Sequence, residues 1–175
     1  MKKVAVFGNA GGGKSTLARK LAELTRIPLY PLDMIQYPGA KKIAHDEYRK
    51  AHAELLRREA WIIDGFGCRE SAWERFAAAD TLIYVDLPLF NHFLWVTKRF
   101  VKGLFVTPEG WPEGSPMISS TISSYRVLWL CHRHLTPAYR SLVSTAANQK
   151  RVHHLRSTAD MAAFVNSVIT ETRLA

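Results

Sequence analysis

A stretch of eight residues near the amino terminus has the composition of a phosphate-binding loop. Residues 8–15 read Gly-Asn-Ala-Gly-Gly-Gly-Lys-Ser and match the pattern G-x-x-x-x-G-K-[ST] in full. Glycines let backbone N–H groups converge on phosphate oxygens, and a helix that begins near Lys14 would point the positive end of its dipole at the same place. In this pattern the lysine binds the β and γ phosphates of ATP, and the hydroxyl of Ser15 coordinates Mg²⁺. The expected nucleotide contacts are Gly8, Asn9, Ala10, Gly11, Gly12, Gly13, Lys14, Ser15 and Thr16.

Short apolar runs alternate with amphipathic segments along the chain, which predicts strands that alternate with helices. The predicted strands are residues 3–7, 28–32, 61–64, 81–86 and 150–155. The predicted helices are residues 14–25, 46–59, 70–79, 90–102, 120–142 and 158–172, the fifth bent or broken near Pro137. This order predicts an α/β fold, the three-layer P-loop NTPase fold, with a parallel five-stranded sheet flanked by helices. Ligands of such sheets bind beyond the carboxyl ends of the strands.

One interval between two predicted basic helices interrupts the alternation. It contains three glycines and three prolines, namely Gly103, Pro108, Gly110, Pro112, Gly114 and Pro116. This spacing is too interrupted for a regular helix or strand. It predicts a lid over about residues 100–118, and an ordinary surface loop is the alternative. A chain of 175 residues has the length of one domain, so we expect a single domain over residues 1–175 that includes the lid.

The chain is basic, with a formal net charge of +9. Cationic surfaces attract nucleic acid and also attract small phosphorylated ligands. The lysines and arginines are spread along the chain and form no terminal arm, which favours a charged cleft for a small ligand. Nucleic acid stays an alternative partner that the pattern does not favour.

No segment has the pattern of a membrane span or a signal peptide. The longest apolar stretch, residues 81–96, is interrupted by Asp86, Asn91 and His92 and is shorter than the roughly 20 residues that span a bilayer. The apolar run at residues 4–7 is too short for a signal peptide. We therefore expect a cytoplasmic protein without a membrane partner.

The two cysteines, Cys68 and Cys131, are too few for a disulfide framework. Free thiols in a reducing compartment are the expectation. Because the cysteines and histidines are scattered along the chain, their spacing predicts no zinc site.

The chain resembles the small P-loop kinases of the adenylate kinase and shikimate kinase group. More closely, it resembles the adenylate-kinase-like proteins labelled DNA topology modulation proteins. The residues that carry the resemblance extend from end to end, namely the phosphate loop, Asp33, residues 61–66, residues 79–88, residues 98–99 and residues 155–157. The resemblance implies an ATP-dependent phosphotransferase with Mg²⁺ as its metal.

The resemblance also implies roles for aspartates at the predicted strand ends. In related kinases of hydroxylated metabolites, the acid after the second strand, here Asp33, holds or deprotonates the acceptor hydroxyl. The metal-side carboxylate lies in the Asp-Gly segment, here Asp64, which would hold Mg²⁺ through water. Asp86 is the competitor for that role, although Pro88 after it indicates a strand exit, where an acid can cap the next helix.

Several arginines could bind the acceptor or the phosphates. Adenylate kinases carry an acceptor-binding arginine after Asp-Gly-Phe-Pro, and here Arg69 and Arg75 follow the corresponding segment. Gly67 and Cys68 replace the usual continuation, which counts against AMP as the acceptor. Arg156 follows the last strand, where related kinases cradle the adenine ring. Further arginines could reach the phosphates when the lid closes, namely Arg99, Arg126, Arg133 and Arg140.

Two functions are consistent with these features. The first is a kinase that transfers the γ-phosphoryl group of ATP to a nucleotide or a hydroxylated metabolite, with Lys14, Asp33, Arg69 and Arg75 as catalytic residues. The second is a nucleotide-dependent, DNA-associated protein without a small-molecule acceptor, which agrees with the basic charge. For the first, the expected partners are ATP, ADP and the acceptor, and a monomer is the expected state.

Overall fold

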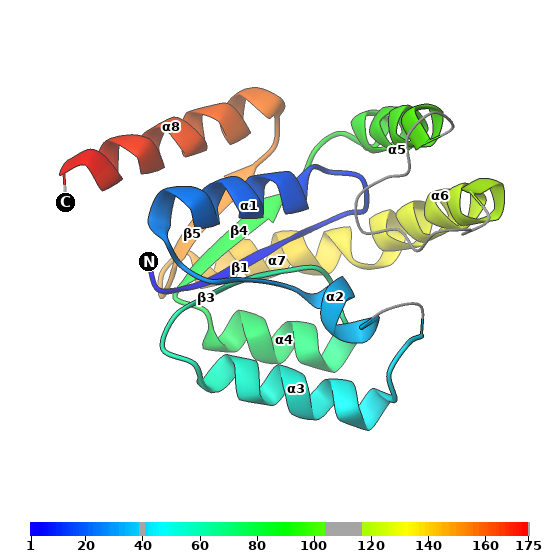
Figure 1. Ribbon diagram of the computed structural model, residues 1–175. Coiled ribbons are helices and arrows are strands. Elements are labelled where there is room, and N and C mark those ends of the chain that lie inside the picture. The colour runs from blue at the N-terminus through cyan, green and yellow to red at the C-terminus, as the bar shows by residue number, and fades with distance from the viewer. Residues whose placement is uncertain (39–40, 104–116, 175) are drawn as a thin grey trace.

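The computed structural model describes residues 1–38, 41–103 and 117–174 (Figure 1). Its strands are β1 (Lys3–Gly8), β2 (Leu29–Pro31), β3 (Trp61–Asp64), β4 (Thr81–Val85) and β5 (Arg151–Leu155). Its helices are α1 (Lys14–Thr25), α2 (Leu32–Gln36), α3 (His45–Arg57), α4 (Arg69–Ala78), α5 (Leu89–Gly103), α6 (Met117–His134), α7 (Thr136–Ala146) and α8 (Thr158–Leu174).

The strands form one parallel sheet in the order β2-β3-β1-β4-β5. β1 is the central strand, and its Val6 is in register with Asp64 of β3 on one side and Ile83 of β4 on the other. All the strands run in the same direction, so their carboxyl ends meet at one edge. The predicted α/β fold with a five-stranded parallel sheet flanked by helices is confirmed.

Helices cover both faces of the sheet. Figure 1 shows α1 and α8 on one face and α3 and α4 on the other, and α7 packs on the same face as α4. Side chains of a strand alternate between faces. Val4 and Val6 of β1 therefore pack with α1 and α8, whereas Ala5 and Phe7 pack with α4 and α7. β1 is buried on both sides as a result.

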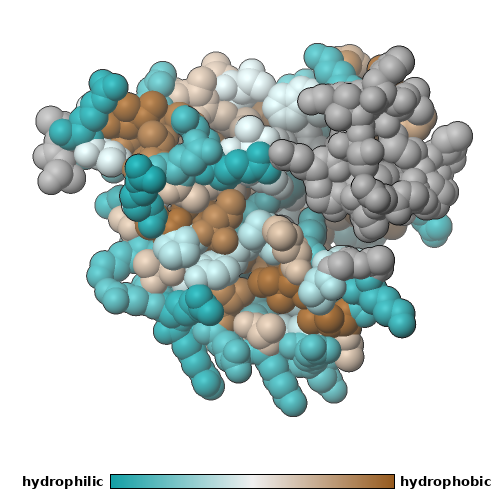
Figure 2. Space-filling model, viewed as in Figure 1, coloured by the Kyte–Doolittle hydropathy of each residue, from teal (hydrophilic) through white to brown (hydrophobic). Residues whose placement is uncertain are grey.

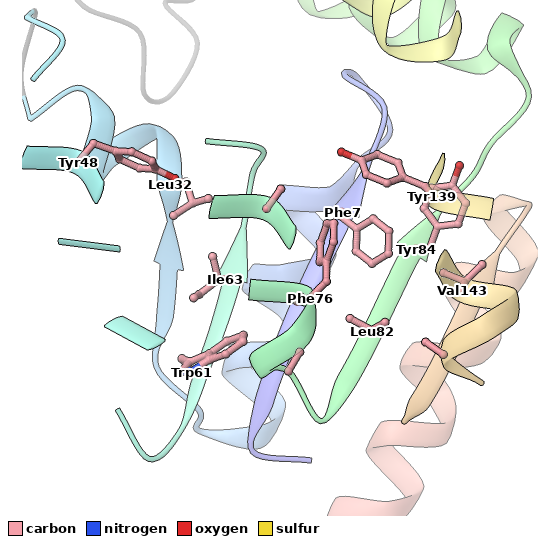
Figure 3. Packing of buried hydrophobic residues seen from close by; sticks show 14 residues of the cluster. Phe7, Leu32, Tyr48, Trp61, Ile63, Phe76, Leu82, Tyr84, Tyr139 and Val143 are labelled. Carbon is pink, nitrogen blue, oxygen red and sulfur yellow. The ribbon is translucent and has the colours of Figure 1, made fainter. Parts of the chain in front are cut away.

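An aromatic cluster fills the space between the sheet and helices α4 and α7 (Figure 3). The ring of Phe7 lies 4.3 Å from that of Phe76, 5.2 Å from that of Tyr84 and 5.0 Å from that of Tyr139, measured between centroids. Aromatic pairs at such separations add to the stabilisation from apolar burial. The cluster fixes α4 and α7 on the sheet next to the strand that carries the phosphate-binding loop.

α3 is amphipathic, and its apolar side lies on α4 and the sheet. Tyr48, His52 and Leu55 are buried at helical spacing, while the opposite side carries acidic and basic residues. Figure 2 shows this outer face as hydrophilic along the lower edge of the molecule. α3 therefore closes one side of the domain.

The fifth predicted helix is interrupted near Pro137, as expected. The structure divides it into α6 and α7, with Leu135 between them and Pro137 in the first turn of α7. Proline lacks the N–H that a helix interior needs, so it is tolerated in a first turn and ends the preceding helix.

The predicted carboxyl-terminal end of the second strand was wrong. β2 stops at Pro31, and Asp33 lies in the first turn of α2 and does not end the strand. β2 lies at the edge of the sheet and, among the described strands, pairs with β3. An acidic side chain in a first helical turn is also favoured by the helix dipole.

The predicted lid, about residues 100–118, lies mostly outside the described residues. No helix in the described part of the chain is long and apolar enough to cross a membrane.

The first prediction concerns the core. Leu82 is fully buried on β4, whereas Leu130 on α6 is 44% exposed, so the two leucines form a matched pair. We expect Leu82→Ala to lower the free energy of unfolding by about 2–5 kcal/mol, because it leaves a cavity. Leu130→Ala should change it by less than about 0.5 kcal/mol. Urea unfolding followed by circular dichroism measures both, and equal effects would contradict this placement of the core.

Candidate active site

The phosphate-binding loop joins the carboxyl end of β1 to α1. Gly13 lies at the N-cap of α1 with a φ of 74°, in the left-handed region that glycine adopts without strain. Three residues of the loop, Gly8, Gly11 and Gly13, have positive φ. The motif therefore has the backbone that its glycines predict.

The loop and the helix behind it present positive charge and N–H groups. In the described part of the chain, the N–H groups of Gly11, Gly12 and Gly13 donate to no protein acceptor. The Lys14 ammonium donates to the Asn9 carbonyl at 2.7 Å, so the lysine lies across the loop. The first turn of α1 contains no acidic residue that would offset its dipole. These features fit a triphosphate.

Helices α5 and α6 hold the loop from outside. His92 of α5 is buried, and its Nδ1 lies 2.7 Å from the Ala10 carbonyl oxygen. Because a carbonyl only accepts hydrogen bonds, Nδ1 carries the proton. Burial lowers the pKa of His92, which keeps the ring neutral. The Asn9 side chain donates to the Leu128 carbonyl of α6 at 3.0 Å. Sequence reasoning missed His92, because no motif marks a residue that reaches the loop across a long chain separation.

Asp33 lies within electrostatic reach of both Asp64 and Lys14 at the carboxyl edge of the sheet. Loss of surrounding water raises the pKa of Asp33, the negative charge of Asp64 raises it further, and the positive charge of Lys14 lowers it. A Cβ atom on Gly65 would lie 3.8 Å from Oδ1 of Asp33. Two carboxylates and one ammonium group therefore share this site.

Asp64 is the residue that was predicted as the metal-side carboxylate. It ends β3 and is buried, and among the described residues its Oδ1 has no hydrogen-bond partner. A buried carboxylate oxygen is costly to leave unpaired. Mg²⁺ binds proteins through one or two oxygen ligands and several waters, which fits this oxygen together with the hydroxyl of Ser15 in the first turn of α1.

The competing aspartate, Asp86, is engaged by other side chains. Arg140 donates to both of its oxygens, at 2.8 and 3.1 Å, and Nε2 of His154 lies 2.8 Å from Oδ2. Burial opposes the charge of Asp86, but these bonds hold the pKa of the carboxyl below its ordinary value. Asp86 thus belongs to a network with Arg140 of α7 and His154 of β5.

The structure separates the two arginines that were predicted to meet the acceptor. Arg69 is exposed in the first turn of α4. Arg75 is fully buried, and its Nη2 donates to the Gly65 carbonyl at 2.8 Å. The guanidinium carbon lies 5.3 Å from the ring centroid of Phe76, and with 0% of Arg75 exposed this structure presents no surface of it to an acceptor. Arg75 was predicted as an acceptor contact from the resemblance to adenylate kinases. Its position on α4 instead directs the side chain into the core.

The remaining predicted nucleotide contact, Arg156, is exposed after β5. Its guanidinium lies 3.4 Å from Nδ1 of His154, and its backbone N–H donates to Asp160 of α8. A pocket of about 700 Å³ begins beside it and is also lined by Pro88 and Arg140. Arg156 therefore follows a strand that is separated by β4 from β1, the strand that leads into the phosphate-binding loop.

Among known proteins, the chain is similar to solved structures and not to family models or curated sequences. No protein-family model matches the sequence, and no curated protein matches it. The fold is similar to shikimate kinase from Acinetobacter baumannii in complex with shikimate, with a TM-score of 0.56 and 17% identity over 100% of this chain and 96% of that one. It is also similar to shikimate kinase from Bacteroides thetaiotaomicron, with a TM-score of 0.53 and 12% identity over 97% of both chains. The chain has the P-loop NTPase fold of these kinases.

Proposed function

We propose that this protein is an ATP-dependent phosphotransferase that moves the γ-phosphoryl group of ATP to a hydroxyl group of a small acceptor. One observation carries the proposal: the phosphate-loop lysine Lys14 and the carboxylates of Asp33 and Asp64 converge at one edge of the sheet. Phosphoryl transfer needs a lysine that binds phosphate, an acid that binds the metal and an acid that accepts a proton. Lys14, the buried Asp64 and the more exposed Asp33 would fill these roles.

Lys14 and the loop N–H groups would stabilise the negative charge that moves toward the bridging oxygen of ATP during transfer. Ser15 and Asp64 would hold Mg²⁺, which supplies further neutralisation of the β and γ phosphates when it is bound. Asp33 would accept the proton of the acceptor hydroxyl while the hydroxyl oxygen forms a bond to the γ phosphorus. The bond between that phosphorus and the oxygen of ADP breaks in the same reaction.

The raised pKa of Asp33 suits this role. A general base is most effective when its pKa lies near the working pH, and loss of surrounding water together with the charge of Asp64 moves the pKa of Asp33 in that direction. A second carboxylate nearby disfavours an acceptor that carries its own phosphate at that point. A hydroxylated metabolite is the better candidate class, and the Acinetobacter shikimate kinase was solved with shikimate, a small molecule, in place. Arg69, exposed at the start of α4, remains a candidate acceptor contact.

Arg75 would hold the backbone of the site and would not contact the acceptor. Its bond to the Gly65 carbonyl holds the peptide that directly follows Asp64. Burial lowers the pKa of Arg75 to about 10, so the guanidinium stays charged at neutral pH. We propose that Arg75 orients the Asp64–Gly65 segment.

The second prediction tests the function itself. With Mg²⁺ and ATP, ADP formation should rise many-fold when one member of a panel of hydroxylated metabolites, nucleosides and nucleotides is added. Lys14→Ala should weaken ATP binding about 10- to 100-fold, because it removes a charged hydrogen bond worth about 1.5–3 kcal/mol. Lys20→Ala is the matched control, since Lys20 is exposed on the same helix and pairs with Glu23. No acceptor response across the panel, with ATP still bound, would argue for a protein without a small-molecule acceptor.

The third prediction concerns the charges around Asp33. In the nucleotide-free protein, the pKa of its carboxyl should lie above the ordinary value of 3.8. Asp64→Asn removes a negative neighbour and should lower this pKa, whereas Lys14→Ala removes a positive neighbour and should raise it. Carbon-13 NMR titration of the aspartate carboxyls measures both shifts. The proton acceptor must be ionised, so activity should fall as the pH drops through the raised pKa. An unchanged midpoint in both variants would show that the three groups do not meet.

The fourth prediction concerns His92. His92→Leu should raise the KM for ATP about fivefold and change kcat less, because it removes a hydrogen bond of about 1 kcal/mol that holds the loop. His92→Asn keeps a donor and should retain more of the wild-type KM. His134→Leu, at an exposed histidine of α6, is the control. If His92→Leu leaves the KM unchanged, the contact with the Ala10 carbonyl does not position the loop.

A further inference from the structure

Three side chains of different chemistry meet where α3 and α4 begin. His45 is the first residue of α3, Cys68 is the N-cap of α4, and Glu70 lies in the first turn of α4. One ligand atom from each, a ring nitrogen, a sulfur and a carboxylate oxygen, lies within 4.8 Å of the other two. We propose that these residues bind a divalent transition metal of the zinc class.

The three ligands match the preferences of such an ion. Zinc sites combine imidazole, thiolate and carboxylate ligands, and a fourth position can be taken by water. Ligand atoms around tetrahedral zinc are about 3.3–3.6 Å apart, given bonds of about 2.0–2.3 Å. The ligand atoms, which lie up to 4.8 Å apart, therefore need to close by at most about 1.2–1.5 Å. His45 and Glu70 are exposed at the surface, so their side chains can rotate to do so.

The framework that carries the ligands is already ordered. The N–H of Cys68 donates to Oγ of Ser71 at 3.1 Å, and the hydroxyl of Ser71 donates back to the Cys68 carbonyl at 3.0 Å. The same Oγ lies 3.0 Å from the hydroxyl of Tyr48, which belongs to α3. The helix that carries His45 is thus tied to the turn that carries Cys68. Figure 1 shows α3 and α4 side by side over this length.

A second bond between the helices defines the charge around the site. Arg49 of α3 donates to Glu74 of α4 at 2.6 Å. The same guanidinium also interacts with the side chain of Cys68 and with the charge of Glu70. Its pairing with Glu74, a carboxylate outside the ligand set, offsets part of the repulsion that it would exert on a bound cation. On binding, Cys68 releases its thiol proton to water and its sulfur forms a bond to the metal, with no change of oxidation state. Thiolate and carboxylate together then balance the charge of a divalent ion.

This site is distinct from the one proposed for Mg²⁺. Asp64 and Ser15 offer oxygen atoms alone, which suit a hard cation, whereas Cys68 and His45 offer sulfur and nitrogen, which suit zinc, cobalt or nickel. Metal binding here would need neither ATP nor an acceptor. A bound metal would join the start of α3 to the start of α4.

The fifth prediction uses Co²⁺ as the probe. Titration of the metal-free, reduced full-length protein with Co²⁺ should produce a thiolate-to-cobalt charge-transfer band in the near ultraviolet that saturates at one equivalent. Cys68→Ser should abolish the band, and serine is a favourable N-cap, so α4 should stay folded. Cys131→Ser is the matched control and should keep the band, because Cys131 is half-buried and burial raises the pKa of its thiol.

Two further measurements make the test independent of that one variant. His45→Gln and Glu70→Gln should each weaken Co²⁺ binding at least tenfold, while His134→Gln on α6 should leave it unchanged. Added Zn²⁺ should displace Co²⁺ and raise the thermal unfolding midpoint of the wild type by several degrees, but not that of Cys68→Ser. Absence of the band in folded wild-type protein, or its survival in Cys68→Ser, would overturn the proposal. Should Cys68→Ser fail to fold, unchanged affinity in His45→Gln would overturn it equally.

Discussion

The burial of β1 in the centre of the sheet determines where every proposed catalytic group can lie. β1 is hydrogen-bonded on both edges and covered on both faces, and Val4, Ala5 and Val6 are fully buried. A strand held in this way cannot shift along its neighbours without exposing apolar side chains or breaking the register. The loop that leaves its carboxyl end therefore begins at a fixed point. The neighbouring strand β3 is in register with β1, so Asp64 ends beside that point.

A balance of charge around the loop follows from this arrangement. Lys14 and Asp64 both act on the carboxyl of Asp33, whereas the guanidinium of Arg75 is buried in the core. His52 is buried close to Arg75, and burial followed by the charge of Arg75 lowers its pKa to about 4. His52 is therefore neutral at physiological pH and adds no second positive charge beside the arginine. Among the described residues, Nε and Nη1 of Arg75 and both ring nitrogens of His52 have no hydrogen-bond partner. Such groups are costly in a core, which agrees with a polar cluster retained for the position of Asp64 and not for stability.

Features that depend on local pattern could be predicted from the sequence. The five apolar runs became the five strands, and the loop motif lies between β1 and α1 as expected, because hydrophobic period and glycine content act over a few residues. Asp33 was placed near the right point but in the wrong element, since nothing in its neighbours shows that an edge strand stops at Pro31. The inward orientation of Arg75 and the contact of His92 depend on the packing of helices on the sheet. These are tertiary contacts, and the periodicity of a single sequence does not reveal them.

The turn between β3 and α4 connects the two proposed metal sites, whose ligands would prefer different ions. Asp64 at its start offers oxygen to a hard cation, and Cys68 at its end offers sulfur to a softer one. Gly67 between them has a φ of 73°, and a side chain there would collide with the hydroxyl of Tyr48. The turn is therefore packed closely against α3, and a metal held by His45 and Cys68 would restrict it further. Since the same turn leads back to Asp64, occupation of the outer site would reduce the freedom of the carboxylate that faces the nucleotide.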